Sequence, residues 1–158
     1  MKVINFHIRP LEPALLQEAL TLVWEVFSEF EAPDYSAEGI QEFKSYIETD
    51  AISRRLEEGG FWIWGAFDGG KLVGVAATRT PMHITLLFVD KQYHRKGIAR
   101  GLVEAAYTFH RVRGNGSAMT VNASPYGEEA YLKLGFHPTG GEQVVNGIRF
   151  IPMVRRSY

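Results

Sequence analysis

The segment Phe61–Phe67, with the sequence FWIWGAF, constrains the fold most because it is apolar on both of its alternating faces. Side chains of a strand point in turn to its two sides, so this strand must be covered on both. Turn residues at 68–70 lead into a second apolar strand at Leu72–Thr78, and a third is expected at His83–Val89, after Pro81. The chain must therefore build a sheet with other elements packed on both faces.

Segments with helical spacing flank this block of strands and can supply the cover. Apolar residues recur every three or four positions through Leu15–Phe30 and again after Gly97. Ser36 is placed to cap a second helix, and a short helical piece is expected around Ala51–Glu58. The pattern thus predicts helices on both sides of the strand block in the sequence.

The remaining elements are short. Strands are expected at 3–9 and at Ala118–Ala123, the latter followed by a helix with Ser124 as its N-cap and Pro125 in its first turn. Because a helix lies between the strands that end at 89 and begin at 118, these two strands should be parallel or splayed. The whole order predicts one mixed α/β sheet with helices on its faces.

The tail predicts a final hairpin. Asn146–Gly147 is a strong signal for a tight turn between two strands. Pro152 has no backbone N–H to donate, which argues for a sheet edge or a bulge in the last strand.

Composition excludes several classes of function. The chain has no cysteine, so disulfides, thiolate metal sites and catalytic thiols are ruled out. Its net charge of −1 argues against non-specific nucleic-acid binding, and no two histidines have the i, i+4 spacing of a helical metal site. The apolar run at 84–89 is too short to cross a membrane, and residues 1–5 lack the apolar stretch of a secretion signal. We expect a cytoplasmic protein without a bound metal.

A basic turn between a strand and a helix is the most informative segment. The strand ending at Val89 runs into a turn with Arg95 and Lys96, and Gly97 then opens a helix. The first amides of a helix have no internal partner and bind anions, and a glycine lets a phosphate approach the backbone closely. Residues 91–113 hold six basic side chains and one acidic one, whereas residues 25–50 hold eight acidic and one basic. The alternative is an ordinary solvated helix start, since neither a P-loop nor a dinucleotide-binding glycine pattern is present.

Two stretches resemble the motifs of one enzyme family. Residues 94–99, HRKGIA, resemble the acetyl-CoA pyrophosphate loop of the GCN5-related N-acetyltransferases, with the pattern Gln/Arg-x-x-Gly-x-Gly/Ala. His94 departs from this pattern, which leaves the backbone intact and puts a side-chain contact there in doubt. Residues 121–136, VNASPYGEEAYLKLGF, resemble the second motif, in which an Asn ends a strand and Ala-Tyr and Leu-Gly-Phe follow. The two motifs and the element order together span nearly the whole chain.

The resemblance implies both a fold and an activity. The fold would be a single α/β domain over residues 1–158, with one mixed, mostly antiparallel sheet of about seven strands flanked by about four helices. The activity would be transfer of an acetyl group from acetyl-CoA, as co-substrate, to a primary amine by direct attack. Acceptors in this family are small amines, polyamines or amines of peptides and proteins.

The resemblance also assigns residues to acetyl-CoA. In the family, loop amides hold the pyrophosphate, and the end of the preceding strand pairs with the pantetheine arm. The residues implied here are Leu87, Phe88, Val89, Arg95, Lys96, Gly97, Ile98, Ala99 and Arg100. Asn122 would hydrogen-bond to the pantetheine arm. The alternative for Asn122, a polar residue that merely ends a strand, is weakened because polar side chains inside sheets need partners.

Two residues are candidates for proton transfer. Tyr131 resembles the family's tyrosine that protonates the departing thiolate, although helical spacing alone would favour a core aromatic before Gly135–Phe136. Some members carry a carboxylate eleven residues before the first motif, and that count leads here to His83. A histidine there could accept a proton from an ammonium group, directly or through water, or it could simply begin a strand.

The family usually builds its acceptor site from the first two helices and the last hairpin. The residues implied here are Trp24, Phe27, Glu29, Phe30, Glu31, Asp34, Tyr35 and Gly140–Gly147. Carboxylates mixed with aromatic rings suit a cationic amine, although acidic helix faces also serve solubility alone.

Other classes of protein stay open. The domain could bind acyl-CoA without catalysis, as a sensor or structural module. It could instead be a nucleotide-binding α/β protein, but that class expects a glycine fingerprint which is absent. The final strands could also pair two copies as a homodimer.

Overall fold

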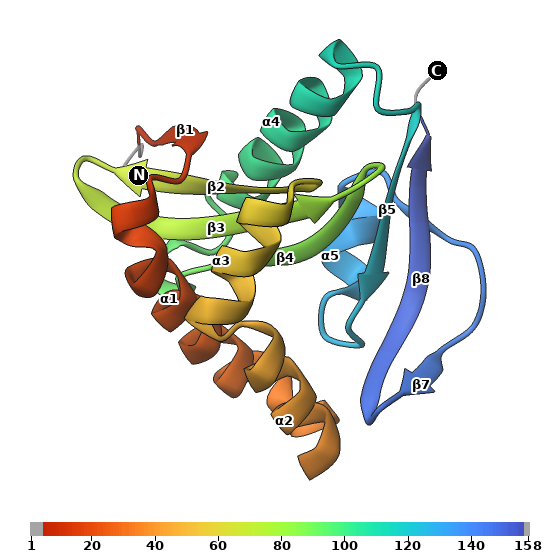
Figure 1. Ribbon diagram of the computed structural model, residues 1–158. Coiled ribbons are helices and arrows are strands. Elements are labelled where there is room, and N and C mark those ends of the chain that lie inside the picture. The colour runs from red at the N-terminus through yellow and green to blue at the C-terminus, as the bar shows by residue number, and fades with distance from the viewer. Residues whose placement is uncertain (1–4, 157–158) are drawn as a thin grey trace.

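A sheet of eight strands organises the computed structural model, which describes residues 5–156 (Figure 1). The strands are β1 (His7–Pro10), β2 (Phe61–Asp68), β3 (Lys71–Arg79), β4 (His83–Val89), β5 (Ala118–Ala123), β6 (His137–Pro138), β7 (Gln143–Val145) and β8 (Ile148–Arg156). Their order across the sheet is β1-β2-β3-β4-β5-β8-β6, with β7 also paired to β8. Among the strands of residues 5–156, only β4 and β5 are parallel neighbours, which confirms the predicted mixed, mostly antiparallel α/β sheet.

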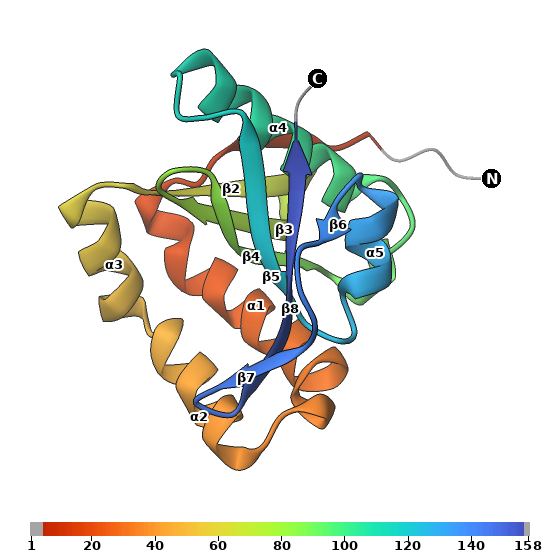
Figure 2. The same ribbon diagram turned by 90° about the vertical axis from the view of Figure 1, so that its right-hand side faces the viewer.

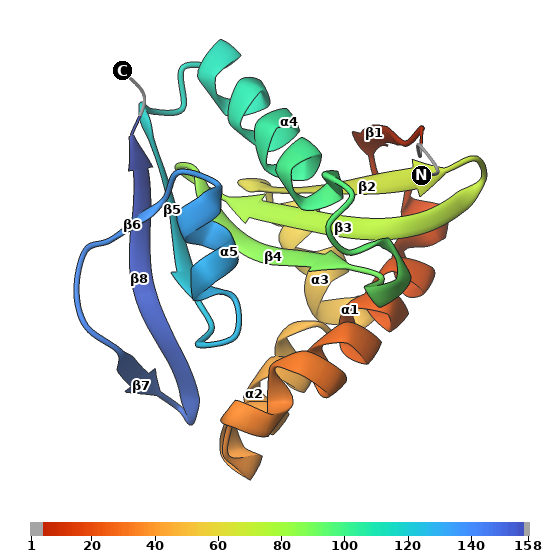
Figure 3. The ribbon, with the colours of Figure 1, turned by 180° about the vertical axis from the view of Figure 1, so that it is seen from behind.

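Within the described part of the chain, five α-helices cover the sheet, three on one face and two on the other (Figures 1 and 3). They are α1 (Leu16–Phe30), α2 (Ala37–Tyr46), α3 (Thr49–Glu58), α4 (Ile98–Val112) and α5 (Glu128–Lys133). Short 3-10 turns occupy Pro13–Leu15, Ala32–Asp34 and Lys91–Tyr93. The first three helices share one face, and α4 and α5 share the other.

Strand β2 lies between two hydrophobic cores, as its apolar sequence predicted. Phe61 and Ile63 pack into the core beneath α1 and α3. Trp64 and Ala66 pack into the core beneath α4. The expectation of a strand covered on both sides is therefore confirmed, and burial of large side chains on each face stabilises the sheet.

The sheet opens between β4 and β5. These strands pair in parallel only at His83–Thr120 and Ile84–Val121, and then they diverge (Figure 2). Thr85 is an extra residue in β4, because Ala77 pairs with Leu86 while the next residue of β3 pairs with Ile84. Such a bulge bends a strand and increases its twist. The prediction of a parallel or splayed pair is confirmed, and one edge of β4 is left unpaired beyond Ile84.

Helix α2 and the turn between β7 and β8 meet below this opening. Ser36 caps α2, as predicted, by accepting a hydrogen bond of 3.2 Å from the backbone of Gly39. The carbonyl of Gly147 lies so close to Gly39 that a Cβ on Gly39 would overlap it. Both positions therefore need glycine, and their contact holds the hairpin against α2.

The helix after β5 begins later than expected. Ser124 accepts a hydrogen bond of 3.0 Å from the amide of Gly127, but α5 starts only at Glu128. Residues 125–127 form a turn instead, so the prediction that Pro125 opens the helix is wrong. Proline and glycine stabilise such a turn before the chain becomes helical. The first strand, predicted at 3–9, is observed at His7–Pro10; positions 3–4 lie outside the described residues.

Pro152 lies inside the sheet, so the expected sheet edge is wrong. Strand β8 has β5 on one side and both β6 and β7 on the other. The carbonyl of Pro152 accepts from Thr139 on the β6 side, so the proline nitrogen faces that side as well. No N–H is needed there, because β7 pairs with residues up to Phe150 and β6 with residues from Met153.

Candidate active site

A pocket of about 850 Å³ fills the opening between β4 and β5, with walls from α1, α2, α4 and α5. Its volume is in the range of small-molecule sites. It brings together nearly all the residues predicted from the sequence. These are His83, Leu87, Phe88, Val89, Arg95, Gly97, Ile98, Ala99, Arg100, Asn122 and Tyr131. Lys96 is exposed and does not line the pocket, so only its backbone could serve as predicted.

The loop between β4 and α4 has the backbone of an anion site. Arg95 and Gly97 both adopt left-handed conformations, with φ of 62° and 84°. Gly97 is the N-cap of α4 and offers no side chain to its first turn, whose first internal bond runs from the amide of Gly101 to Gly97. The amides of residues 98–100 are therefore available to a ligand at the positive end of the helix dipole. A left-handed Arg is unusual and is typical of loops shaped for a ligand.

The loop is tied to β4 and to α1 through His94. Its Nε2 donates to the carbonyl of Val89 at 2.7 Å, and its ring lies 5.3 Å from that of Phe30. Phe30 also stacks on Tyr126, at 5.1 Å. The His94 side chain thus closes the loop onto the last residue of the strand. Between Thr85 and Val89 the edge of β4 faces the pocket with no strand beside it, as the predicted pairing with pantetheine requires.

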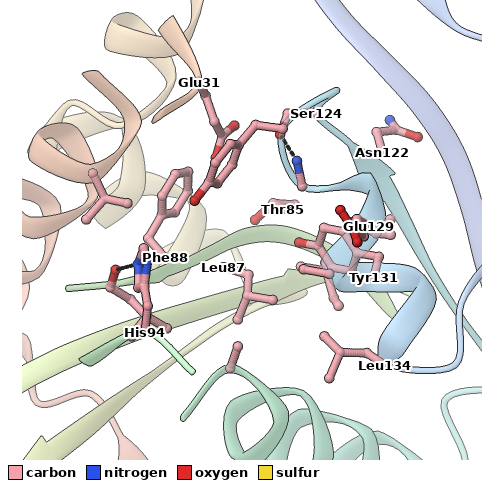
Figure 4. Close-up of a pocket in the computed structure, with 18 of the residues that line it drawn as sticks. Glu31, Thr85, Leu87, Phe88, His94, Asn122, Ser124, Glu129, Tyr131 and Leu134 are labelled. Carbon is pink, nitrogen blue, oxygen red and sulfur yellow. Dashed lines mark hydrogen bonds between the residues drawn. The ribbon is translucent and has the colours of Figure 1, made fainter. Parts of the chain in front are cut away.

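Tyr131 reaches into the pocket from α5, opposite Leu87 (Figure 4). Its ring packs edge-on against Phe136 at 5.4 Å, so it has a structural role as well. Burial raises the pKa of its phenol far above the ordinary value, and the nearby Glu31 and Tyr35 raise it further. The phenol therefore stays protonated across the physiological range and can act only as a proton donor or a neutral hydrogen-bond partner.

The family comparison agrees with this geometry. The model of the GNAT acetyltransferase domain matches residues 31–157, which is most of the chain. The chain belongs to the GNAT family of acetyltransferases. This confirms the resemblance drawn from the two motifs.

Solved structures share the fold of this GNAT domain at low sequence identity. A GCN5-related N-acetyltransferase from Rhodopseudomonas palustris is 23% identical with a TM-score of 0.84, and the match covers 99% of both chains. PaiA N-acetyltransferase from Thermoplasma acidophilum, solved with coenzyme A, is 19% identical with a TM-score of 0.79, covering 98% of this chain and 100% of that one. The ribosomal-protein-S18-alanine N-acetyltransferase from Escherichia coli is 19% identical with a TM-score of 0.63, covering 96% and 94%. No curated protein sequence gives a significant match.

His83 stands in this GNAT domain where β4 still pairs with β5. Its Nδ1 is hydrogen-bonded to the hydroxyl of Thr120 at 2.7 Å. Burial, with a smaller contribution from the charge of Arg79, lowers the pKa of the imidazole to about 4. The ring is therefore neutral at pH 7 and binds a proton weakly. Its assignment as the base stays a prediction.

Of the carboxylates that line the pocket within residues 5–156, Glu31 is the one whose pKa departs clearly from its ordinary value. It follows the last residue of α1 and lines the pocket near Ser124 (Figure 4). Burial raises the pKa of its carboxyl to about 7; a hydrogen bond from Ser124 opposes this, and the charge of Asp34 adds to it. Sequence reasoning placed Glu31 among the acceptor residues but gave it no chemical role. Its position before Ala32–Pro33, where the helix must stop, was the available signal.

The other predicted acceptor residues divide between core and surface. Phe27 is fully buried, so the expectation that it faces an acceptor is wrong, and Trp24 stacks on it at 5.7 Å. Glu29 is exposed and bound to Lys91 at 3.2 Å. Tyr35 lines the pocket with Glu31. The helical spacing of the aromatic residues on α1 therefore reflects packing.

Within residues 5–156 no helix is both long and apolar enough to cross a bilayer. The same residues contain no group of three histidine or carboxylate side chains placed to hold a metal ion.

Proposed function

We propose that this GNAT domain transfers the acetyl group of acetyl-CoA to a primary amine. The observation that carries the proposal is one pocket with an anion-binding loop at one end and a protonated phenol, Tyr131, at the other. The unpaired edge of β4 runs between them. These are the parts that an acyl carrier with a diphosphate, a peptide-like arm and a thioester would contact in turn.

The loop end fits the diphosphate of acetyl-CoA. Gly97 leaves the first turn of α4 uncovered, and a Cβ at Gly97 would meet nothing within 4 Å, so the approach is open. Arg95 and Arg100 line the pocket there with positive charge. Amides at the start of a helix bind phosphate groups without any particular side chain, which is why the His94 departure is tolerated. Leu87, Phe88 and Val89 would pair with the pantetheine arm, and Asn122 would hydrogen-bond to it.

Acetyl-CoA supplies an acyl group activated as a thioester. Tyr131 would donate its proton to the sulfur as the carbon–sulfur bond breaks. In a half-buried site a neutral thiol is a better leaving group than a charged thiolate. The raised pKa of the phenol keeps that proton in place until the sulfur gains charge. This role agrees with the position of the Tyr131 side chain, which points into the pocket (Figure 4).

The acceptor would be a cationic amine. Glu31 and Glu42 line the pocket on the side of α1 and α2, together with the aromatic rings of Tyr35, Phe43 and Tyr46. Carboxylates attract an ammonium group, and aromatic faces hold it by cation–π contact. One enzyme of similar structure, from Escherichia coli, is an N-acetyltransferase of an alanine in ribosomal protein S18, so its acceptor is also an amine.

The test is thiol release from acetyl-CoA against a panel of amines. We expect release that depends on the amine, with amines bearing a second positive charge faster than neutral ones of similar size. Binding of acetyl-CoA with no amine-dependent release would identify a non-catalytic acyl-CoA module instead. Equal rates with cationic and neutral acceptors would remove the charge argument.

A further inference from the structure

Glu31 is held in place by the end of α1. Its amide donates to the carbonyl of Phe27 at 2.9 Å, which completes the last turn of the helix. Pro33 then forces the chain into a 3-10 turn at Ala32–Asp34, so the side chain of Glu31 leaves the helix toward the pocket. The position is set by backbone geometry rather than by a flexible loop.

Hydroxyl groups surround this carboxylate. Ser124 accepts from the amide of Gly127 at 3.0 Å, which leaves the Ser124 proton free for its hydrogen bond to Glu31. The phenols of Tyr35 and Tyr131 are close enough to have their pKa values raised by the charge of Glu31. Neutral hydroxyls hold a carboxylate ionised less strongly than a directly bound cation would.

The charged and titratable groups that face Glu31 come from every neighbouring segment. They are Asp34, whose charge acts on Glu31, and Tyr35, Tyr126 and Tyr131, on which the charge of Glu31 acts. Two cations act on these neighbours: Arg95 on Tyr126, and Arg149 on Tyr35, the latter also donating to the carbonyl of Asp34 at 3.2 Å. Arg149 is itself bound to Glu142 at 2.9 Å. The negative end of the α1 dipole also lies at Glu31 and disfavours the charged form.

We propose that Glu31 is the general base that removes a proton from the ammonium group of the acceptor. The assignment rests on the acetyltransferase function proposed above. It follows from the position of Glu31 in the same pocket as Tyr131, next to the hydroxyl of Ser124.

The proton balance is complete with these two residues. Glu31 takes one proton from the ammonium, and the neutral amine then forms a bond from its nitrogen to the acetyl carbon. As the carbon–sulfur bond breaks, Tyr131 gives its proton to the sulfur and regains one from the acylated nitrogen. Glu31 releases its proton to water, so each turnover yields the amide, the free thiol and one proton.

A burial-raised pKa of about 7 suits Glu31 to this task better than His83. A base works best when its pKa lies near the working pH. The pKa of His83 is about 4, and its Nδ1 is already engaged by Thr120. The two candidates give different pH profiles and can be separated.

The experiment compares Glu31→Gln with Glu25→Gln, a control on the exposed face of the same helix. We expect Glu31→Gln to lower kcat/KM at pH 7 by about 100-fold. Its rate should then rise about tenfold per pH unit as solvent supplies more neutral amine, and calorimetry should show unchanged acetyl-CoA affinity. Glu25→Gln should behave as the wild type.

A measurement without substrate checks the same residue. A ¹³C NMR titration of the ligand-free protein should show one carboxyl that titrates near pH 7, absent in Glu31→Gln and present in Glu25→Gln. Glu31→Asp, which keeps the carboxylate, should recover part of the rate if the fold is intact by circular dichroism.

The outcomes separate this assignment from the proposed function. Two results would overturn the assignment alone. One is full activity of Glu31→Gln with an unchanged fall in rate on the acidic side of the pH–rate profile, and the other is a Glu31 carboxyl that titrates near its ordinary pKa. If the fall in rate on the acidic side of the pH–rate profile disappeared in His83→Ala but not in Glu31→Gln, the role of general base would pass to His83. A wild-type protein that releases no thiol with any amine would overturn the proposed function and this assignment together.

Discussion

The two ends of the pocket are built in different ways. The end at the β4–α4 loop is made mainly of backbone: two left-handed residues, Arg95 and Gly97, and the free first turn of a helix. The other end is made of side chains, with Glu31 from α1 and Tyr131 from α5 facing one space. Arginine side chains line the first end, whereas the second holds a carboxylate with a raised pKa.

The two ends should respond differently to single substitutions. Backbone sites depend on local conformation, so a single added Cβ can disturb them while most side-chain replacements do not. Side-chain sites depend on individual functional groups, so the loss of one atom removes a chemical step.

Removing one oxygen at the side-chain end should have the largest effect. Tyr131→Phe keeps the ring that packs on Phe136 but removes the proton donor, so we expect kcat to fall by about 100-fold. The affinity for acetyl-CoA, measured by calorimetry, should stay within about twofold because most of the binding contacts lie elsewhere. Tyr107→Phe, on α4 beside Arg155, is the control. Unchanged turnover in Tyr131→Phe would remove the proton-donor role.

Adding one carbon at the backbone end should weaken binding. Gly97→Ala forces a side chain into a left-handed conformation, which costs about 1 to 2 kcal/mol or relaxes the loop, and acetyl-CoA affinity should fall about tenfold. Gly114→Ala is a matched control: Gly114 is also left-handed, also has open space around its Cβ position, and follows the other end of α4.

The two glycine variants should lose similar stability, measured by chemical denaturation. Only Gly97→Ala should lose affinity for acetyl-CoA. Equal affinities in both variants would show that the loop amides do not form the binding site.

Stability should depend on pH through Glu31. Its pKa is raised to about 7 in the folded protein, so ionising it costs free energy that the unfolded chain does not pay. The wild type therefore loses stability as pH rises from about 4.5 to 7, whereas Glu31→Gln, which stays neutral, does not. We expect the variant to be more stable by about 1 to 3 kcal/mol at pH 8 and equal at pH 4. Denaturant unfolding at the two pH values measures this; a variant less stable at pH 8 would contradict the burial of the charge.

Replacing the side chain that departs from the family pattern should have the smallest effect. His94→Gln retains a donor for the carbonyl of Val89, and the loop amides are unaffected, so acetyl-CoA affinity should stay within about twofold. A much larger change would mean that the His94 side chain itself contacts the ligand.

The division also explains what the sequence could predict. The loop end is continuous in sequence, so its glycine, its basic residues and its place between a strand and a helix are visible together. The apolar pattern of Phe61–Phe67 likewise predicted a strand covered on both faces, and the two cores confirm it. Local signals of this kind depend on a few neighbouring residues.

The side-chain end could be predicted only in part. Tyr131 followed from a motif, but Glu31 and Ser124 lie on segments far apart in the chain and meet only because β4 and β5 diverge. Phe27 was assigned to the acceptor site but is fully buried, because helical spacing fits an acceptor face and a core equally well. Burial decides between these roles, and burial is a property of the folded chain. Pro152 was misassigned for a similar reason, because the gap between β6 and β7 cannot be seen in sequence.

The proposed function requires that the amides at the start of α4 bind the diphosphate of acetyl-CoA. An NMR titration of the ¹⁵N-labelled protein with acetyl-CoA tests it most directly. We predict the largest amide shifts at residues 95–100, followed by those of the free β4 edge at 85–89. A titration that leaves the amides of 95–100 unmoved, at concentrations where the ligand saturates other acetyltransferases, would contradict the account.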